Sequence, residues 1–245
     1  MTWVANKCGG ARFRTLPDFR VEVEGMGFPL PDPARQKLLE QTWKNWKGVI
    51  RKWSAIRTKE CLKQRKTAGA PSCALLPPSN ILAIMTQETG HKSDNKKVQS
   101  TITSPAGAAG LMQVMPCKIF NPEKELGKLV CTHDMTNPDH AVKVGSRFLQ
   151  VHLGNREGLP AAASNYNSGD LTCYKPGHVP NPFNWNHEQN YALRVVEYNN
   201  AAIKMGVNDP SLWPWVFGGL AFAGAGIYLG IRTGKLPAPP RLLGR

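Results

Sequence analysis

The chain has 245 residues, of which 41% are hydrophobic and 20% are charged, so it can fill a packed core and does not have the composition of a disordered protein. Lys and Arg number 31 and Asp and Glu number 17, which gives a formal net charge of +14. This charge favours anionic partners, namely nucleic acid, an acidic membrane surface or an anionic cell-wall polymer, and does not choose among them. No collagen period, heptad array or solenoid repeat is found, which excludes those architectures.

The N-terminal part divides into an expected arm and an expected helix. Residues 1–33 are rich in Gly and Pro and show little periodicity, so we expect an extended arm or irregular loop without a secretory signal. Residues 34–66 place apolar side chains at spacings of three and four, which predicts a basic helix with one apolar stripe. The stripe consists of Leu39, Trp43, Trp46, Ile50 and Trp53. We favour docking of this stripe on the neighbouring domain; the alternatives are a membrane interface or a glycan strand.

Residues 78–208 form the expected main domain, and a Pro-, Ala- and Gly-rich linker over residues 67–77 separates it from the basic helix. One helix is expected to begin at Ile81, with Ser79 or Asn80 as its N-cap. No pairs of period-2 strands stand out, so this domain is predicted to be mainly helical. We expect a polar loop over residues 91–103 and further helices over residues 108–115, 138–152, 159–167 and 187–205.

The C-terminal end has the composition of a membrane anchor. Residues 211–231 carry no charge, and the segment Trp213–Ile231 is long enough to cross the hydrocarbon core as a helix. We therefore predict a transmembrane anchor over residues 209–232, followed by a basic tail over residues 233–245. A buried helical hairpin of a soluble domain is the alternative.

Six cysteines permit one to three disulfide bonds in an oxidising compartment. The pairs Cys61–Cys73 and Cys117–Cys131 are the first candidates, because each closes a short local loop; Cys8 and Cys173 are the other two. Free buried thiols are an equal alternative. A zinc site would draw on Cys117, Cys131, His133 and His140, but these residues lack the close pairs typical of structural zinc sites, so we predict no metal.

Glu88 is the carboxylate that stands out. It follows the apolar run ILAIMTQ at the end of a predicted helix. A carboxyl group held against apolar neighbours keeps its proton more readily, which is what a general acid requires. A glutamate at a helix end is more often a solvated surface residue, so the assignment needs the context of the motifs that follow.

Three motifs occur in order along the chain: Glu88–Thr89, then SPAGAAGLMQVMP over residues 104–116, then NYNSG over residues 165–169, with Tyr191 beyond them. This set resembles the catalytic domain of the soluble-type lytic transglycosylases, and the resemblance extends over residues 81–205. The family usually has Ser where this chain has Thr89, and Ala where it has Asn165; neither change removes a group that the chemistry needs.

The resemblance implies a lysozyme-like fold, of the α+β class with little strand, that acts on peptidoglycan without a cofactor. It implies that Glu88 is the single acid and base and that Gln113 and Met112 line the sugar cleft. It also implies that Tyr166 and Asn167 lie opposite Glu88 and orient it or the substrate. For Met112 and Tyr191, packing in the core is an alternative nearly as good as a binding role. The implied substrate-binding residues are Thr89, Met112, Gln113, Tyr166, Asn167 and Tyr191.

The implied reaction cleaves the MurNAc-β-1,4-GlcNAc bond and leaves 1,6-anhydro-MurNAc ends. Glycosidases ordinarily need two carboxylates, but no second carboxylate accompanies the three motifs, and attack by the sugar's own C6 hydroxyl needs only one. Asp94, in the polar loop, is the nearby candidate for a second carboxylate. A hydrolytic muramidase that uses Asp94 or a fixed water is therefore the alternative on the same fold.

An anchor without a signal peptide favours a virion protein of a membrane-containing bacteriophage, which opens the cell wall locally as the phage genome enters the cell. Its expected partners are peptidoglycan strands, a membrane and other virion membrane or DNA-delivery proteins, and nucleic acid is not required. A transglycosylase of a conjugation or secretion system is the nearest rival. A non-catalytic assembly or DNA-delivery membrane protein is the alternative of a different class, with the +14 charge contacting nucleic acid.

Overall fold

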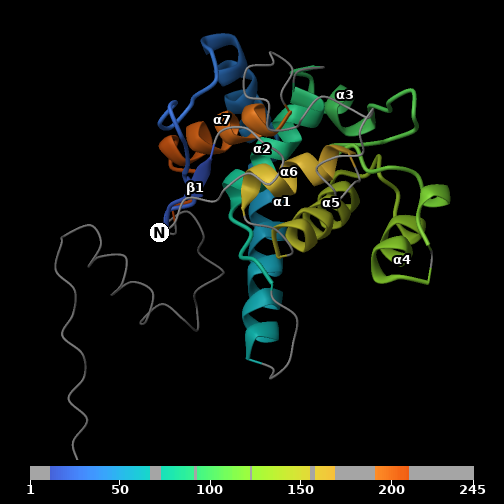
Figure 1. Ribbon diagram of the computed structural model, residues 1–245. Coiled ribbons are helices and arrows are strands. Elements are labelled where there is room, and N and C mark those ends of the chain that lie inside the picture. The colour runs from blue at the N-terminus through green and yellow to red at the C-terminus, as the bar shows by residue number, and fades with distance from the viewer. Residues whose placement is uncertain are drawn as a thin grey trace, which may run out of the picture. The chain divides into compact units, whose positions relative to one another are not determined.

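The computed structural model describes residues 12–66, 73–90, 93–121, 123–154, 158–168 and 191–209. The chain separates into two compact units, residues 1–208 and residues 209–245. In the described part, all of the first unit apart from its N-terminal hairpin is helical or irregular (Figure 1). The predicted mainly helical fold with little strand is therefore confirmed.

The described part of the N-terminal arm, residues 12–33, contains a β-hairpin. Strands β1 (Phe13–Thr15) and β2 (Val21–Val23) pair antiparallel, and their apolar side chains lie in the core. Asn200 holds this hairpin on a distant helix, because its amide accepts a hydrogen bond from the Val21 N–H and donates one to the Val21 carbonyl, both at 2.8 Å. The prediction of an irregular arm over residues 1–33 is wrong here, since three-residue strands are too short to show a period of two.

Helix α1 (Pro33–Arg65) agrees with the expected basic helix. It begins at Pro33 after an N-cap, Asp32, whose carboxylate accepts from the Arg35 N–H. The apolar stripe is buried in the same core as the helices that follow, with Trp43 partly covered. Docking of the stripe is confirmed, and Figure 1 shows α2 and α5 beside α1. The hairpin and α1 share one core with the helices after residue 77, while the domain boundaries themselves stay a prediction.

Helix α2 (Pro78–Met85) is buried along its whole length. It begins before the expected Ile81, and neither Ser79 nor Asn80 is its N-cap, since both lie inside the helix. A backbone N–H of the first turn instead finds its acceptor far along the chain, because the Ser79 N–H donates to Oδ1 of Asn208 at 3.0 Å. A cap supplied by a residue so distant in sequence leaves no local signal.

The segment expected to be a polar loop contains helix α3 (Lys96–Thr101). Asn95 caps it, because its side-chain oxygen accepts from the N–H groups of Lys97 and Val98. The prediction of a loop over residues 91–103 is therefore wrong for this part.

The segment expected to be a helix over residues 108–115 consists of turns and isolated bridges. Gly110 has φ +72° and Gln113 has φ +46°, and a right-handed helix cannot continue through such residues. Gly110 is required, since a Cβ there would lie 1.8 Å from the Met135 carbonyl oxygen. The run of apolar residues reflects burial in the core rather than helical periodicity.

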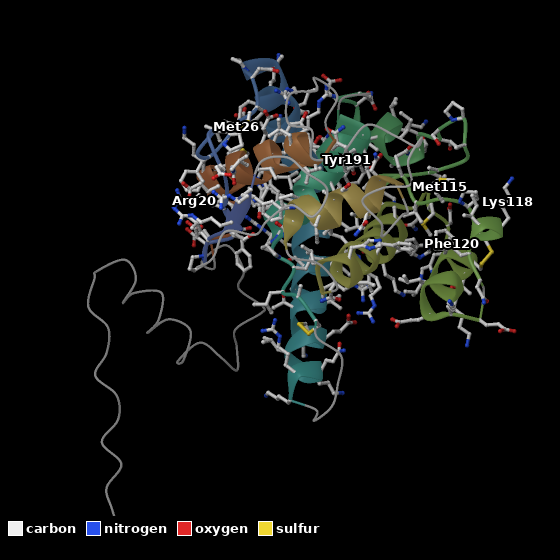
Figure 2. The ribbon with its side chains drawn as sticks, viewed as in Figure 1. Arg20, Met26, Met115, Lys118, Phe120 and Tyr191 are labelled. Atoms are coloured by element: carbon white, nitrogen blue, oxygen red, sulfur yellow. A yellow bond between two sulfur atoms is a disulfide. The ribbon has the colours of Figure 1, made fainter. Side chains whose placement is uncertain are left out.

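The remaining helices agree with the predictions. Helices α5 (Pro138–Gly154) and α6 (Leu159–Ser168) cover the expected ranges, and α7 (Tyr191–Lys204) covers the described part of the last one. Helix α7 packs on α2 and α6, and α6 packs on α5; α2 itself contacts α7, α1 and α5. The short helix η2 (Cys117–Ile119) and α4 (Glu125–Thr132) lie at one edge (Figure 1), on the side where Met115, Lys118 and Phe120 are labelled in Figure 2.

Two predicted disulfide bonds are confirmed, Cys61–Cys73 and Cys117–Cys131. The alternatives of free thiols and of a zinc site with thiolate ligands are therefore wrong for these four residues. Among the described residues, no group of three His, Cys, Asp or Glu side chains is arranged to hold a metal ion. Cys8 and Cys173 lie outside the described residues.

The predicted membrane segment Trp213–Ile231 and the basic tail over residues 233–245 also lie outside the described residues. Within the ranges that the structure describes, no helix combines the length and the apolar character needed to span a bilayer.

Candidate active site

Glu88 lies on η1 (Thr86–Gly90), a single π-helical turn that continues α2. Such turns frequently occur at functional sites. The hydroxyls of Thr86 and Thr89 donate to carbonyls four residues earlier, at 2.8 Å and 2.9 Å. Thr89 is fully buried and its hydroxyl bonds to the helix backbone, so it fixes the turn beside Glu88; the structure provides no exposed hydroxyl there for a substrate.

The carboxylate of Glu88 accepts a hydrogen bond from Tyr191. The Tyr191 hydroxyl donates to Oε1 of Glu88 at 2.6 Å, from the first residue of α7, where Figure 2 labels it. Burial raises the pKa of Tyr191 well above its ordinary value, and the negative charge of Glu88 raises it further. Tyr191 therefore keeps its proton at neutral pH and remains a donor to the carboxylate.

Tyr166 is the second tyrosine of the site. Burial raises the pKa of its hydroxyl well above the ordinary value, and the negative charge of Glu88 adds to that effect. Its hydroxyl donates to the Met112 carbonyl oxygen at 2.7 Å. The structure therefore joins Tyr191 of α7 directly to Glu88 of η1, and it joins Tyr166 of α6 to the Met112 backbone. The substrate-binding roles of both tyrosines stay predictions.

Met112 acts on the site through its backbone. Its side chain is fully buried and packs so closely on Gly145 that a Cβ at that glycine would lie 2.5 Å from the Met112 sulfur. The side chain therefore lies in the core, which is the packing alternative for Met112, and it offers no exposed surface to a sugar. Only its carbonyl, which receives the Tyr166 hydroxyl, contributes to the site. A backbone partner of this kind carries no signal in the sequence.

Gln113 holds the turn beside the site. Its side-chain nitrogen donates to the carbonyl oxygens of Ile102 and Gly110, both at 3.0 Å, and its backbone has a positive φ. These bonds satisfy the nearly buried amide and fix the turn that presents Met112. Asn167, the residue after Tyr166 on α6, is exposed. The substrate-binding roles of Gln113 and Asn167 stay predictions.

Asp94, the candidate for a second carboxylate, is exposed. Its backbone carbonyl accepts from the Asn45 side chain at 3.1 Å. Glu88 itself is half-buried, held by a phenol on one side and carried by a buried helix. This arrangement suits a single carboxyl group that alternately gives up and accepts a proton at the protein surface.

A family model described as the transglycosylase SLT domain matches residues 72–179. The match contains Glu88, the turn around Gln113 and Tyr166, and it ends before Tyr191. No curated protein matches the chain, and no solved structure does.

Proposed function

Since its SLT domain makes this chain a peptidoglycan lytic transglycosylase, a lyase that acts on the cell wall, we propose that Glu88 is its single acid and base. We propose that the enzyme cleaves the MurNAc-β-1,4-GlcNAc bond and leaves a 1,6-anhydro-MurNAc end. The observation that carries this proposal is the 2.6 Å hydrogen bond from Tyr191 to a half-buried carboxylate on a π-helical turn.

The proposed reaction needs no water and no second carboxylate. The protonated Glu88 gives its proton to the glycosidic oxygen, and the bond between that oxygen and C1 of MurNAc breaks with its electron pair on the oxygen. The C6 hydroxyl oxygen of the same sugar bonds to C1, and its proton passes to the Glu88 carboxylate. Glu88 is thereby restored. The nucleophile belongs to the substrate, so it acts at a high effective concentration.

Tyr191 supports both proton transfers. Because its hydroxyl donates to Oε1, it fixes the orientation of the carboxyl group before the first transfer. After that transfer it stabilises the carboxylate, since a hydrogen bond to the charged form favours that form. Tyr166 is fixed by its hydrogen bond to the Met112 carbonyl oxygen.

The alternative is a hydrolytic muramidase in which Asp94 or a fixed water supplies the nucleophile. Mass spectrometry of digested peptidoglycan distinguishes the two reactions. We expect products that end in 1,6-anhydro-MurNAc. Products with reducing MurNAc ends, heavier by one water, would overturn the proposal in favour of hydrolysis.

We also propose that the enzyme works in an oxidising compartment and is anchored in a membrane by residues 209–232. Two disulfide bonds support the first part, and the uncharged sequence over residues 211–231 supports the second. Association with a virion, and opening of the wall as a phage genome enters the cell, fit this combination. Flotation of the full chain with vesicles, compared with a chain ending at residue 208, tests the anchor; equal flotation would contradict it.

A non-catalytic assembly or DNA-delivery protein remains the alternative of a different class. That alternative predicts that the substitution Glu88→Gln leaves function intact. The geometry of the site favours the enzyme instead, because a purely structural role gives no reason to hold a half-buried carboxylate with a half-buried phenol.

A further inference from the structure

Helix α1 lies outside the residues that the family model matches, yet it packs directly on the turn that carries Glu88. Gly90, two residues after Glu88, faces Thr42 of α1. A Cβ at Gly90 would lie 2.9 Å from the Thr42 hydroxyl oxygen and 3.1 Å from Thr86, so only glycine fits there without a shift. The wall behind this end of η1 is therefore built by α1.

Gln99 of α3 connects α1 to the same region. This side chain is fully buried, and both ends of its amide are satisfied. Its oxygen accepts from the Trp46 indole nitrogen at 2.7 Å and from the Asn45 amide at 3.2 Å. Its nitrogen donates to the Ser93 carbonyl at 2.9 Å and to the Thr42 hydroxyl at 3.4 Å. A buried polar network that is fully satisfied holds its members in one arrangement.

The network continues from Gln99 to the residue next to Glu88. The Ser93 N–H donates to the Thr89 carbonyl at 3.2 Å, and the Thr89 hydroxyl is bonded to α2. Hydrogen bonds thus link the Trp46 indole to Gln99, Gln99 to Ser93, and Ser93 to Thr89, which adjoins Glu88 in the chain.

We propose that α1, through Trp46 and Gln99, is a positioning element for Glu88. This inference rests on the proposed catalytic role of Glu88. Trp46 and Gln99 touch no reacting atom. They act by fixing the backbone on the C-terminal side of η1, so that the carboxyl group meets the glycosidic oxygen in a productive orientation. Positioning of this kind raises the rate of the chemical step rather than the affinity for the substrate.

Trp53 offers a matched control on the same helix and in the same stripe. It is buried to nearly the same extent, with 8% of its surface exposed against 6% for Trp46. Its indole nitrogen also donates to a side-chain oxygen, Oδ1 of Asp139 at 3.0 Å, but Asp139 belongs to α5. The substitutions Trp46→Phe and Trp53→Phe therefore each remove one indole N–H donor from the same helix, and only the first interrupts the link to Glu88.

The experiment measures kcat and KM for soluble glycan release, with the melting temperature, for the full chain and both Phe variants. We expect Trp46→Phe to lower kcat about tenfold with KM unchanged, while Trp53→Phe keeps kcat within about twofold for a similar loss of melting temperature. If Trp46→Phe fails to fold, the milder variant Asn45→Ala takes its place. Asn45→Ala removes the other donor to the Gln99 oxygen and should also lower kcat.

A double variant, Trp46→Phe with Gln99→Leu, adds a second check. Since both changes interrupt one network, its kcat should be no lower than that of the worse single variant, whereas independent effects would multiply. Equal kcat values for Trp46→Phe and Trp53→Phe would overturn the inference. Failure of the proposed function gives a different result, because Glu88→Gln would then keep wild-type activity.

Discussion

The two halves of α1 bury the same kind of apolar stripe and hold different parts of the molecule. The first half, around Trp46, bonds to α3 and packs on the turn that carries Glu88. The second half, around Trp53, bonds to α5 and contains Cys61, which a disulfide bond joins to Cys73 beyond the end of the helix. Substitutions in the first half should therefore change catalysis, whereas substitutions in the second half should change stability.

Arg57 shows what the second half does. Its guanidinium group is almost fully buried, and it donates to the Lys143 carbonyl at 2.7 Å and to the Ser146 hydroxyl at 3.3 Å, both on α5. Burial lowers the pKa of Arg57, against the opposing effect of the nearby Glu60 carboxylate. A charged group placed between two helices in this way fixes how they pack and is remote in the bonding network from Glu88.

The largest effect on stability should come from the disulfide of the second half. Replacing both partners, Cys61→Ala with Cys73→Ala, should lower the free energy of unfolding by about 3 kcal/mol, because the bond closes a short loop in the unfolded chain. Urea unfolding measures this change. At 25 °C, kcat for glycan release should stay within about twofold of the wild type. A large fall in kcat for the folded double variant would contradict the separation between the two halves.

In the candidate active site, Tyr191→Phe removes the hydrogen bond to Glu88. We expect activity to fall about tenfold, which corresponds to about 1.4 kcal/mol for one bond to a charged group. The alkaline limb of the pH profile should move to higher pH, since a carboxylate that has lost a donor holds its proton more tightly. Rates measured across a pH series give both the fall in activity and the position of the alkaline limb.

Tyr198→Phe is the matched control for that experiment. Tyr198 is buried on the same helix, α7, and the substitution removes the same atom. It should leave the alkaline limb in place. The same shift in both variants would show that the phenol of Tyr191 has no specific effect on Glu88.

The smallest effects should appear in the dependence of stability on pH. Burial alone would raise the pKa of Asp139, but hydrogen bonds from Lys52 and Trp53 outweigh it and hold the pKa below its ordinary value. Because the folded state binds this proton more weakly than the unfolded state does, the contribution is present above about pH 4 and is lost as the pH falls through the lower folded value. Melting temperatures of the wild type and Asp139→Asn should therefore converge in acid.

The tyrosines of the site predict the opposite sign. The pKa values of Tyr166 and Tyr191 are raised on folding, so their contribution is complete below about pH 10 and is lost as the pH rises through the folded values. Tyr191→Phe should therefore reduce the loss of stability in alkali. A variant that altered only the acid side would contradict this assignment.

The sequence predicted the features that depend on local spacing or on short motifs. The period of the Trp stripe predicted α1 and its buried face, and the short loops predicted two disulfides. The motifs singled out Glu88, to which Tyr191 donates a hydrogen bond. Each of these signals lies in neighbouring residues or in residue types that few other roles require.

The features that the sequence did not predict depend on distant partners or on the backbone. Gln99 looks like an ordinary polar residue of a loop, and only the fold places it against Trp46. The apolar run after residue 107 resembles a helix until the positive φ of Gln113 is known. Met112 contributes a carbonyl, and every residue has one. Neighbouring residue types carry no information about such contacts.

The most direct test of the account is the rate at which 1,6-anhydro ends form, measured for the wild type, Glu88→Gln and Asp94→Asn on the same peptidoglycan. With a single carboxyl group in both proton transfers, Glu88→Gln should lose about a thousandfold in rate at an unchanged melting temperature, and Asp94→Asn should stay within about twofold of the wild type. A wild-type rate for Glu88→Gln, or an inactive and folded Asp94→Asn, would contradict the assignment of Glu88 as the single acid and base.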